Sequence, residues 1–130
     1  DTVFSLNVEE GVPSFIFGDQ AHIRQVLINL LGNSVKFTQG GRISLTIKPL
    51  YSYTHAITLG FIIKDTGLGM NTQQVNDILE PHSEIAEDGT VGLGLSVSKQ
   101  LIEMMDGKIK IYSTQDVGTT FTFTLKFNIV

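Results

Sequence analysis

The chain has 130 residues, enough to bury one ordinary core and too few for two, so we expect residues 1–130 to form a single domain. Its formal net charge of −4 gives no electrostatic reason to expect binding to nucleic acid or to an anionic membrane surface. The absence of cysteine excludes disulfides and thiolate metal sites, and no apolar run approaches the roughly 20 residues of a membrane span. Because the chain begins at Asp1 in a strand-like run without an initiator methionine, we expect a fragment of a longer protein.

A pair of short strands and a long helix are predicted for the N-terminal part. Residues 2–8 alternate apolar and polar side chains, and residues 14–17 form a second strand-like run after a turn. Apolar residues at helical spacing then predict a helix over residues 19–38, with Asp19 as its N-cap.

This helix carries a second, polar stripe beside its apolar face. The stripe consists of Gln25, Asn29, Asn33 and Lys36, spaced 4, 4 and 3 apart. Asparagine lowers helix stability by roughly half a kcal/mol relative to alanine at an interior position. Two asparagines one turn apart therefore suggest that their side chains have a functional role. Neutral amide oxygens suit a hard cation that is already carried by phosphates. A polar helix edge without function is the alternative that this helix alone leaves open.

Strands and a glycine-rich turn are predicted for the centre of the chain. Residues 42–48 alternate, Pro49 is expected to end their strand, and residues 57–64 form a strongly strand-like run. The sequence Asp-Thr-Gly-Leu-Gly follows directly at residues 65–69. A carboxylate fixed at a strand end can accept a hydrogen bond from an exocyclic amine, and glycines let the backbone approach a flat ring. The same residues could also form an ordinary Asp-Gly turn.

Two further helices are predicted, over residues 71–79 and 92–105, separated by an irregular segment at residues 80–91. The second helix opens with Gly-Leu-Gly-Leu at residues 92–95, where free N–H groups and the helix dipole favour a phosphate. A flexible loop that merely begins a helix is the alternative. The full Rossmann pattern and the P-loop motif are both absent, because position 72 is threonine and no Gly-Lys-Ser/Thr occurs.

Strands at residues 108–113 and 119–127 complete the chain. The order of elements, with hairpin-like pairs at both ends, predicts an α+β fold: a two-layer α/β sandwich with a mixed sheet and helices on one face. An amide-lined helix, a carboxylate after a strand and a glycine pair before a helix together indicate a nucleoside triphosphate pocket without a P-loop.

The sequence closely resembles the catalytic, ATP-binding domain of sensor histidine kinases, within the superfamily that includes gyrase, the heat-shock chaperone ATPases and the mismatch-repair MutL proteins. Residues 25–38 resemble the asparagine box of this family, residues 65–69 its first glycine box and residues 92–100 its second. Residues 107–123 are similar to its closing hairpin. The resemblance covers nearly the whole chain and implies the Bergerat ATP-binding fold.

The resemblance also implies a role for each matching position. Asn33 would ligate a Mg²⁺ that bridges the phosphates, Asn29 would contact phosphate or the metal shell, and Lys36 would neutralise phosphate charge; these three are the implied catalytic residues. Phe37 would wall the pocket and Asp65 would bind the adenine amine. The other implied ATP-binding positions are Gly67, Gly69, Met70, Gly92, Leu93, Gly94 and Leu95.

The activity implied is transfer of the γ-phosphoryl group of Mg-ATP to a histidine on a separate dimerisation domain, for relay to the receiver domain of a response regulator. A hydrolytic ATPase of the gyrase or MutL kind is the second hypothesis, but those proteins carry a glutamate where this chain has Asn29, and an amide cannot act as a general base. None of His22, His55 and His82 has the context of a phosphoacceptor, so the accepting histidine is expected upstream of this segment. The domain is expected to be cytoplasmic, whether or not its parent protein is anchored in a membrane.

Two departures from the family pattern motivate a third hypothesis, a degenerate docking module. The family usually has Phe-x-Pro-Phe between its glycine boxes, whereas this chain has Leu-Glu-Pro-His at residues 79–82. The lid segment that follows, residues 83–91, is short and acidic and lacks arginine and lysine.

Overall fold

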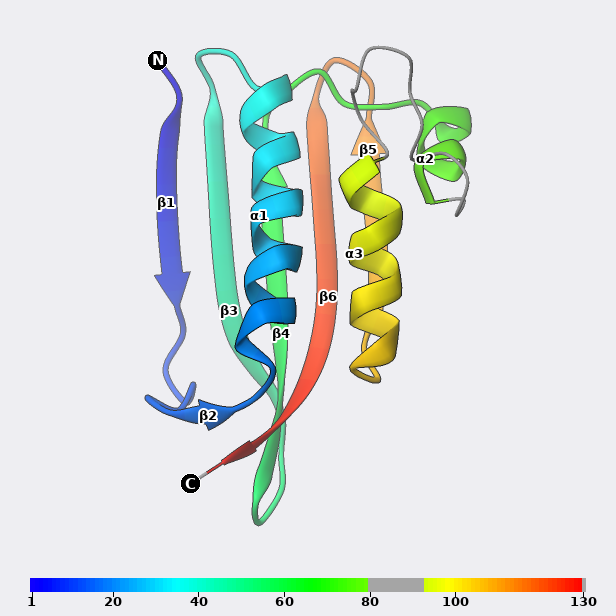
Figure 1. The fold of residues 1–130 in the computed structure, drawn as a ribbon. Coiled ribbons are helices and arrows are strands. Elements are labelled where there is room, and N and C mark those ends of the chain that lie inside the picture. Colours follow the sequence, from blue (N-terminus) through cyan, green and yellow to red (C-terminus); the bar gives the residue numbers. More distant parts are fainter. Residues whose placement is uncertain (80–92, 130) are drawn as a thin grey trace.

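A computed structural model describes residues 1–79 and 93–129. These residues form one mixed sheet with helices packed on one of its faces (Figure 1). In chain order the elements are β1 (Val3–Val8), β2 (Ile16–Phe17), α1 (Gln20–Phe37), β3 (Arg42–Ser52), β4 (Ala56–Asp65), α2 (Thr72–Leu79), α3 (Leu93–Met104), β5 (Lys108–Thr114) and β6 (Gly118–Ile129). The predicted α+β class and the mixed sheet are confirmed.

The sheet has the strand order β1-β3-β4-β6-β2, and β5 also pairs with β6. Strand β1 runs parallel to β3, and all other pairs are antiparallel. Figure 1 shows α1 lying in front of β4, and α3 lying beside it in front of β5, with β6 between the two helices. Strand β6 is thus bonded to three other strands, although it is the last element of the chain.

Two details of the strand prediction were wrong. Strands β1 and β2 do not form a hairpin: β1 pairs with β3, which is reached through α1, and β2 pairs with Ile129 and Asn128 at the end of β6. A parallel pair needs such a helical crossover, and local sequence does not reveal it. Strand β3 also continues through Pro49, because a register irregularity between Pro49 and Tyr51 accommodates a residue that cannot donate to the ladder.

The core lies between the helices and the two central strands. Alternate side chains of β4 and β6 face the helices because successive residues of a strand point to opposite faces. They are Ile57, Leu59, Phe61, Ile63, Phe121, Phe123, Leu125 and Phe127, and all are buried. The rings of Phe61 and Phe123 stack with centroids 4.7 Å apart. From the helices, this core includes Val26, Leu30, Leu95 and Ile102.

Side-chain caps set the starts of two helices. The predicted cap of α1 is confirmed, since Asp19 Oδ1 accepts from the His22 N–H at 3.1 Å. At α2, Asn71 Oδ1 accepts from the Gln74 N–H and Gln74 Oε1 accepts from the Asn71 N–H, both at 2.8 Å. This reciprocal pair is a capping box and identifies Asn71 as the cap.

Among the described residues, no helix is both long and apolar enough to cross a membrane.

Candidate functional site

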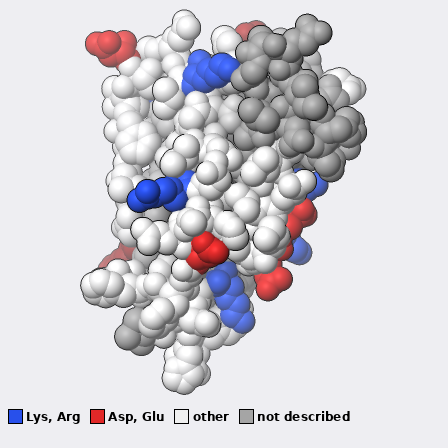
Figure 2. All heavy atoms as spheres, in the orientation of Figure 1, with Lys and Arg blue, Asp and Glu red and all other residues white. Residues whose placement is uncertain are grey.

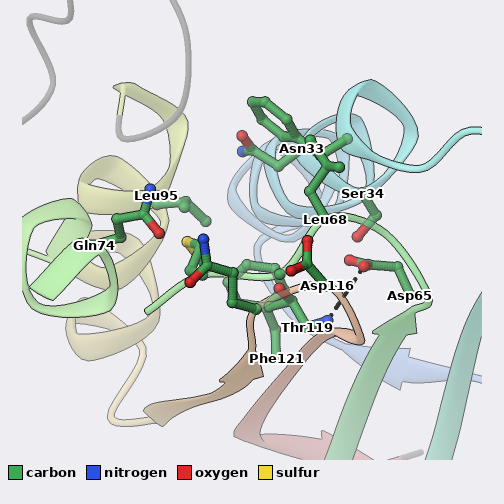
Figure 3. Close-up of a pocket in the computed structure, with 13 residues that line it drawn as sticks. Asn33, Ser34, Asp65, Leu68, Gln74, Leu95, Asp116, Thr119 and Phe121 are labelled. Carbon is green, nitrogen blue, oxygen red and sulfur yellow. Dashed lines mark hydrogen bonds between the residues drawn. The ribbon is translucent and has the colours of Figure 1, made fainter. Parts of the chain in front are cut away.

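A cavity of about 310 Å³ opens between α1, the start of α3 and the adjoining ends of β4 and β6 (Figure 3). Of the predicted site residues, Asn33, Phe37, Asp65, Gly69, Met70 and Leu95 line it. They come from three segments that are far apart in the sequence, and the sheet and the packing of α1 against α3 bring them together.

Asp65, the last residue of β4, lies at the floor of this cavity and is only 6% exposed. Its Oδ1 accepts from the Gly67 N–H at 2.9 Å and from the Thr119 N–H at 3.3 Å. These two bonds hold the carboxylate in one orientation. A group that recognises a ligand needs a fixed orientation, whereas a solvent-exposed turn residue does not. A buried carboxylate must also have its hydrogen-bonding capacity satisfied, by protein, water or ligand.

Ser34 lies beside Asp65 and is 1% exposed, but its Oγ has no hydrogen-bond partner among the described residues. Figure 3 shows its hydroxyl directed toward the Asp65 side chain. An unsatisfied buried hydroxyl costs about 1–3 kcal/mol, so its place in a cavity wall makes Ser34 a candidate contact for a ligand or an ordered water. The pair offers an acceptor and a donor to one polar edge, between the apolar side chains of Leu68, Met70 and Phe121. A flat heterocycle with an exocyclic amine fits this arrangement.

The polar stripe of α1 reaches the cavity at one position. Asn33 lines it, and Asn33 Nδ2 donates to the Asn29 carbonyl at 2.9 Å, so Asn33 Oδ1 is the atom left to meet a ligand. Asn29 and Lys36 do not line this cavity. The side-chain oxygen of Asn29 accepts from Gln25 Nε2 at 2.8 Å, and Lys36 Nζ lies 5.5 Å from the centroid of the Phe37 ring. The predicted roles of Asn29 and Lys36 stay predictions.

The glycines of residues 65–69 are needed for packing of the turn itself. A Cβ on Gly67 would collide with the Phe37 carbonyl oxygen, and one on Gly69, whose φ is +67°, would collide with the Thr114 carbonyl oxygen. Gly67 does not line the cavity. The turn is also bonded on both sides, from the Leu68 N–H to the Phe37 carbonyl at 3.2 Å and from the Asp116 N–H to the Leu68 carbonyl at 2.6 Å. It is therefore wedged between the end of α1 and the β5–β6 turn.

The second predicted glycine box is described only in part. Gly92 lies outside the described residues, as do His82 and the acidic segment 83–91. Leu93 and Gly94 form the first turn of α3, and the buried Leu95 lines the cavity. The placement of Leu95 agrees with the expectation that this helix start belongs to the site.

The sequence prediction missed several lining residues, of which Thr119 is the most informative. Thr119 is the cross-strand partner of Asp65, and its hydroxyl is 2.8 Å from Ser113 Oγ. Ser113 Oγ in turn accepts from the Met70 N–H at 2.8 Å. This chain of bonds links the turn after β4 to β5 and β6. Strand periodicity could have placed Thr119 on the helix side, but only the β4–β6 register places it beside Asp65.

Metal-binding capacity is limited in the part of the chain that the structure describes. No group of three or more histidine, aspartate or glutamate side chains there could hold an ion. The amide oxygen of Asn33 is a single neutral ligand, which fits a Mg²⁺ that keeps waters and takes its other ligands from phosphates. It does not fit a dedicated all-protein metal cage.

The fold and the cavity agree with one family of known proteins. Residues 18–129 match the family described as "Histidine kinase-, DNA gyrase B-, and HSP90-like ATPase", and the chain therefore belongs to this family. Within it, the similar proteins are histidine kinases, and the chain corresponds to their catalytic ATP-binding domain.

Three relatives illustrate this similarity. "Hybrid signal transduction histidine kinase B" of Dictyostelium discoideum is 38% identical over an alignment of 128 residues that covers 94% of this chain and 6% of the relative. "Peroxide stress-activated histidine kinase mak2" of Schizosaccharomyces pombe is 36% identical, over 97% of this chain and 6% of its own length. "Sensory/regulatory protein RpfC" of Xanthomonas campestris is 35% identical, over 97% of this chain and 18% of its own length. The chain thus spans less than a fifth of these relatives.

Solved structures of histidine kinases are also similar to this chain. The structure described as full-length ShkA in complex with AMPPNP is 27% identical, with a TM-score of 0.79, and the match covers 99% of this chain and 26% of ShkA. The mycobacterial sensor histidine kinase MprB, at 22% identity and a TM-score of 0.75 over 99% of this chain and 84% of MprB, shares the fold.

Proposed function

We propose that the chain binds Mg-ATP in this cavity and presents the γ-phosphoryl group for transfer to a histidine on a separate dimerisation domain. The observation that carries the proposal is the buried Asp65–Ser34 pair, a fixed acceptor beside an unsatisfied hydroxyl at the floor of an apolar cavity. The ShkA structure, which was determined with an ATP analogue, supports it.

Adenine recognition would use the floor of the cavity. The Asp65 carboxylate would accept a hydrogen bond from the exocyclic amine. The Ser34 hydroxyl would donate to a ring nitrogen or to a water that bridges to the ring. Leu68, Met70 and Phe121, which line the cavity, would contact the faces of the ring. A guanine base presents a carbonyl where adenine has its amine, and two acceptors would then oppose each other. The site is therefore expected to prefer adenine.

Phosphate binding would use the rim formed by α1 and the start of α3. Asn33 is the proposed ligand of Mg²⁺, which when bound would neutralise phosphate charge and fix the phosphate geometry. The N-terminus of α3, at Leu93–Leu95, would supply backbone N–H groups and the positive end of the helix dipole. Gly92, which precedes it in the sequence, is proposed to act with these residues. Asn29 and Lys36, further along the α1 stripe, are proposed to act on the phosphates from the same side.

The chemistry expected of these groups is positioning and charge stabilisation. Asn29 stands where a hydrolytic relative has a glutamate, and its amide cannot take a proton from water. We therefore propose phosphoryl transfer to a side chain over rapid hydrolysis. The acceptor would be a histidine on a helical dimerisation domain, from which a response-regulator receiver takes the group. The domain is proposed to act in the cytoplasm.

Thermal unfolding with different nucleotides tests the binding step. The ATP analogue AMPPNP with Mg²⁺ should raise the melting temperature by mass action, since a ligand at 100 times its Kd stabilises by about 2.7 kcal/mol. The guanine analogue GMPPNP, and AMPPNP with EDTA, should give smaller shifts. The absence of a shift with Mg-AMPPNP would contradict the proposal.

A transfer assay tests the second step. The chain is mixed with a helical phosphoacceptor domain of a related kinase and ATP labelled on its γ-phosphate, and label is expected on the acceptor histidine. Steady-state hydrolysis that outpaces transfer would favour a gyrase-like ATPase. Nucleotide binding without either reaction would favour the docking module.

A further inference from the structure

The sheet has an open face, which α1 and α3 do not cover, and most of the positive charge of the chain lies on it. We define it by the residues of β3–β6 that alternate with the core positions. Six of the nine lysine and arginine residues occupy such positions: Arg42, Lys48, Lys64, Lys108, Lys110 and Lys126. Figure 2, which views the helix side, shows basic side chains only as separate groups among acidic and uncharged atoms.

Negative charge is absent from this open face. No aspartate or glutamate occurs among the alternating positions of β3–β6, since Asp65 points to the helix side and is buried. The other residues of the face are mainly hydroxyl-bearing, including Thr120, Thr122 and Thr124 along β6. In a chain with a net charge of −4, one face is thus uniformly positive. Chance mixing of surface charges would distribute both signs over it.

The strand register arranges these lysines around a shallow hollow. Lys48, Gly60, Thr124 and Lys108 form one row across β3, β4, β6 and β5. In the adjacent row Ile62, Thr122 and Lys110 lie side by side. These residues, with Leu50 and Tyr112, line a hollow of about 360 Å³. Since Gly60 has no side chain, the row is open between its two lysines.

We infer that this open face docks an acidic protein surface, a compact patch of aspartate and glutamate side chains. Its cations are complementary to carboxylates, and its threonine hydroxyls together with Tyr112, which is 58% exposed, are suited to neutral contacts at an interface.

The border of the open face favours a compact protein patch over a nucleic acid or a membrane. Exposed carboxylates lie where the strands end: Glu9 and Glu10 follow β1, and Asp106 precedes β5. An extended polyanion or an anionic bilayer would continue past the lysines and meet these like charges. A patch no wider than β3–β6 would contact the lysines alone.

The test follows backbone amide NMR signals of the isotope-labelled chain during titration with a short synthetic peptide of alternating glutamate and alanine, which is no longer than the width of β3–β6 and so represents a compact acidic patch. We expect shifts along β3, β4, β6 and β5. The variant Lys108→Glu/Lys110→Glu should bind the peptide at least about tenfold more weakly. The variant Arg24→Glu/Lys99→Glu, which changes the net charge equally but on the helices, should bind it unchanged.

Three results would overturn the inference. They are equal weakening in both double variants, peptide-induced shifts outside β3–β6, or tighter binding of a DNA duplex or of phosphatidylserine vesicles through the same lysines. Melting curves of both variants check that they are folded. The affinity for Mg-AMPPNP should be the same in both, because the cavity lies on the helix side, so the outcome is independent of the proposed nucleotide function.

Discussion

Asp65 Oδ1 accepts a hydrogen bond from the backbone N–H of Thr119 at 3.3 Å, across 54 residues of sequence. The same oxygen accepts from the Gly67 N–H at 2.9 Å. The carboxylate proposed to recognise adenine therefore also ties the turn after β4 to the central strand β6. Substitutions at Asp65 must keep its shape if recognition is to be measured apart from stability.

Asp65→Asn should weaken adenine recognition while the chain stays folded. Its amide oxygen can still accept from Gly67 and Thr119, but the charged acceptor is lost, and hydrogen bonds to charged groups contribute about 1.5–3 kcal/mol. We expect the affinity for Mg-AMPPNP, measured by calorimetry, to fall at least about tenfold, with less preference over GMPPNP. Asp106→Asn is the matched control, since Asp106 is exposed at φ 60°, which asparagine tolerates. Equal effects of the two variants on affinity would contradict the proposed role of Asp65 in adenine recognition.

Ser34→Ala should change stability and affinity in opposite directions. Removing an unsatisfied buried hydroxyl should leave the free chain equally stable or about 1 kcal/mol more stable to urea. The affinity for Mg-AMPPNP should fall, because the hydroxyl is proposed to find its partner in the ligand. Ser96→Ala is the control: Ser96 Oγ is also buried without a partner, but Ser96 does not line the cavity. Unchanged affinity in Ser34→Ala would exclude the contact.

Asn33→Ala should remove the part of nucleotide binding that depends on metal. The affinity for AMPPNP in EDTA should be nearly unchanged, whereas the gain on adding Mg²⁺ should shrink at least about tenfold. Titrations with and without Mg²⁺ measure this gain directly. Gln25→Ala, on the same stripe two turns earlier and exposed, should retain it. A similar loss with and without metal would show that Asn33 acts on the nucleotide or the fold instead.

Gly69→Ala should destabilise the chain much more than Gly40→Ala. Both glycines have positive φ, +67° and +69°, so both substitutions carry the left-handed penalty of about 1–2 kcal/mol. A Cβ at Gly40 has nothing within 4 Å, whereas one at Gly69 collides with the Thr114 backbone. We expect about 3 kcal/mol or more at Gly69 by urea unfolding. Equal losses would mean that the turn can move away from β5 at little cost.

The sequence predicted the elements well because their signals are local. The period of α1, the Asp19 cap and the alternation along β4 and β6 all depend on neighbours within a few residues. Asp65 and Asn33 were selected as candidates for the same reason, since each stands in a short motif, and their roles stay predictions. Their position in one cavity agrees with that prediction.

What the sequence did not reveal depends on strand register. The parallel pairing of β1 with β3 and the irregularity that carries β3 past Pro49 follow from contacts between distant segments. Thr119 and Ser34 were missed because nothing in their own neighbourhood distinguishes them from other small polar residues. Only the pairing of β4 with β6 and the packing of α1 place them next to Asp65.

The central place of β6 has a consequence for how the chain acquires its structure. Strand β6 is the last of the described elements to be synthesised, yet β2, β4 and β5 all bond to it. During translation, the edges of β2, β4 and β5 that pair with β6 therefore stay unpaired, and their apolar side chains stay exposed, until β6 leaves the ribosome. Such late, long-range pairing is slow and exposed to aggregation. Truncation within β6 should accordingly abolish folding of the whole domain, while truncation of β1, bonded only to β3, should be far better tolerated.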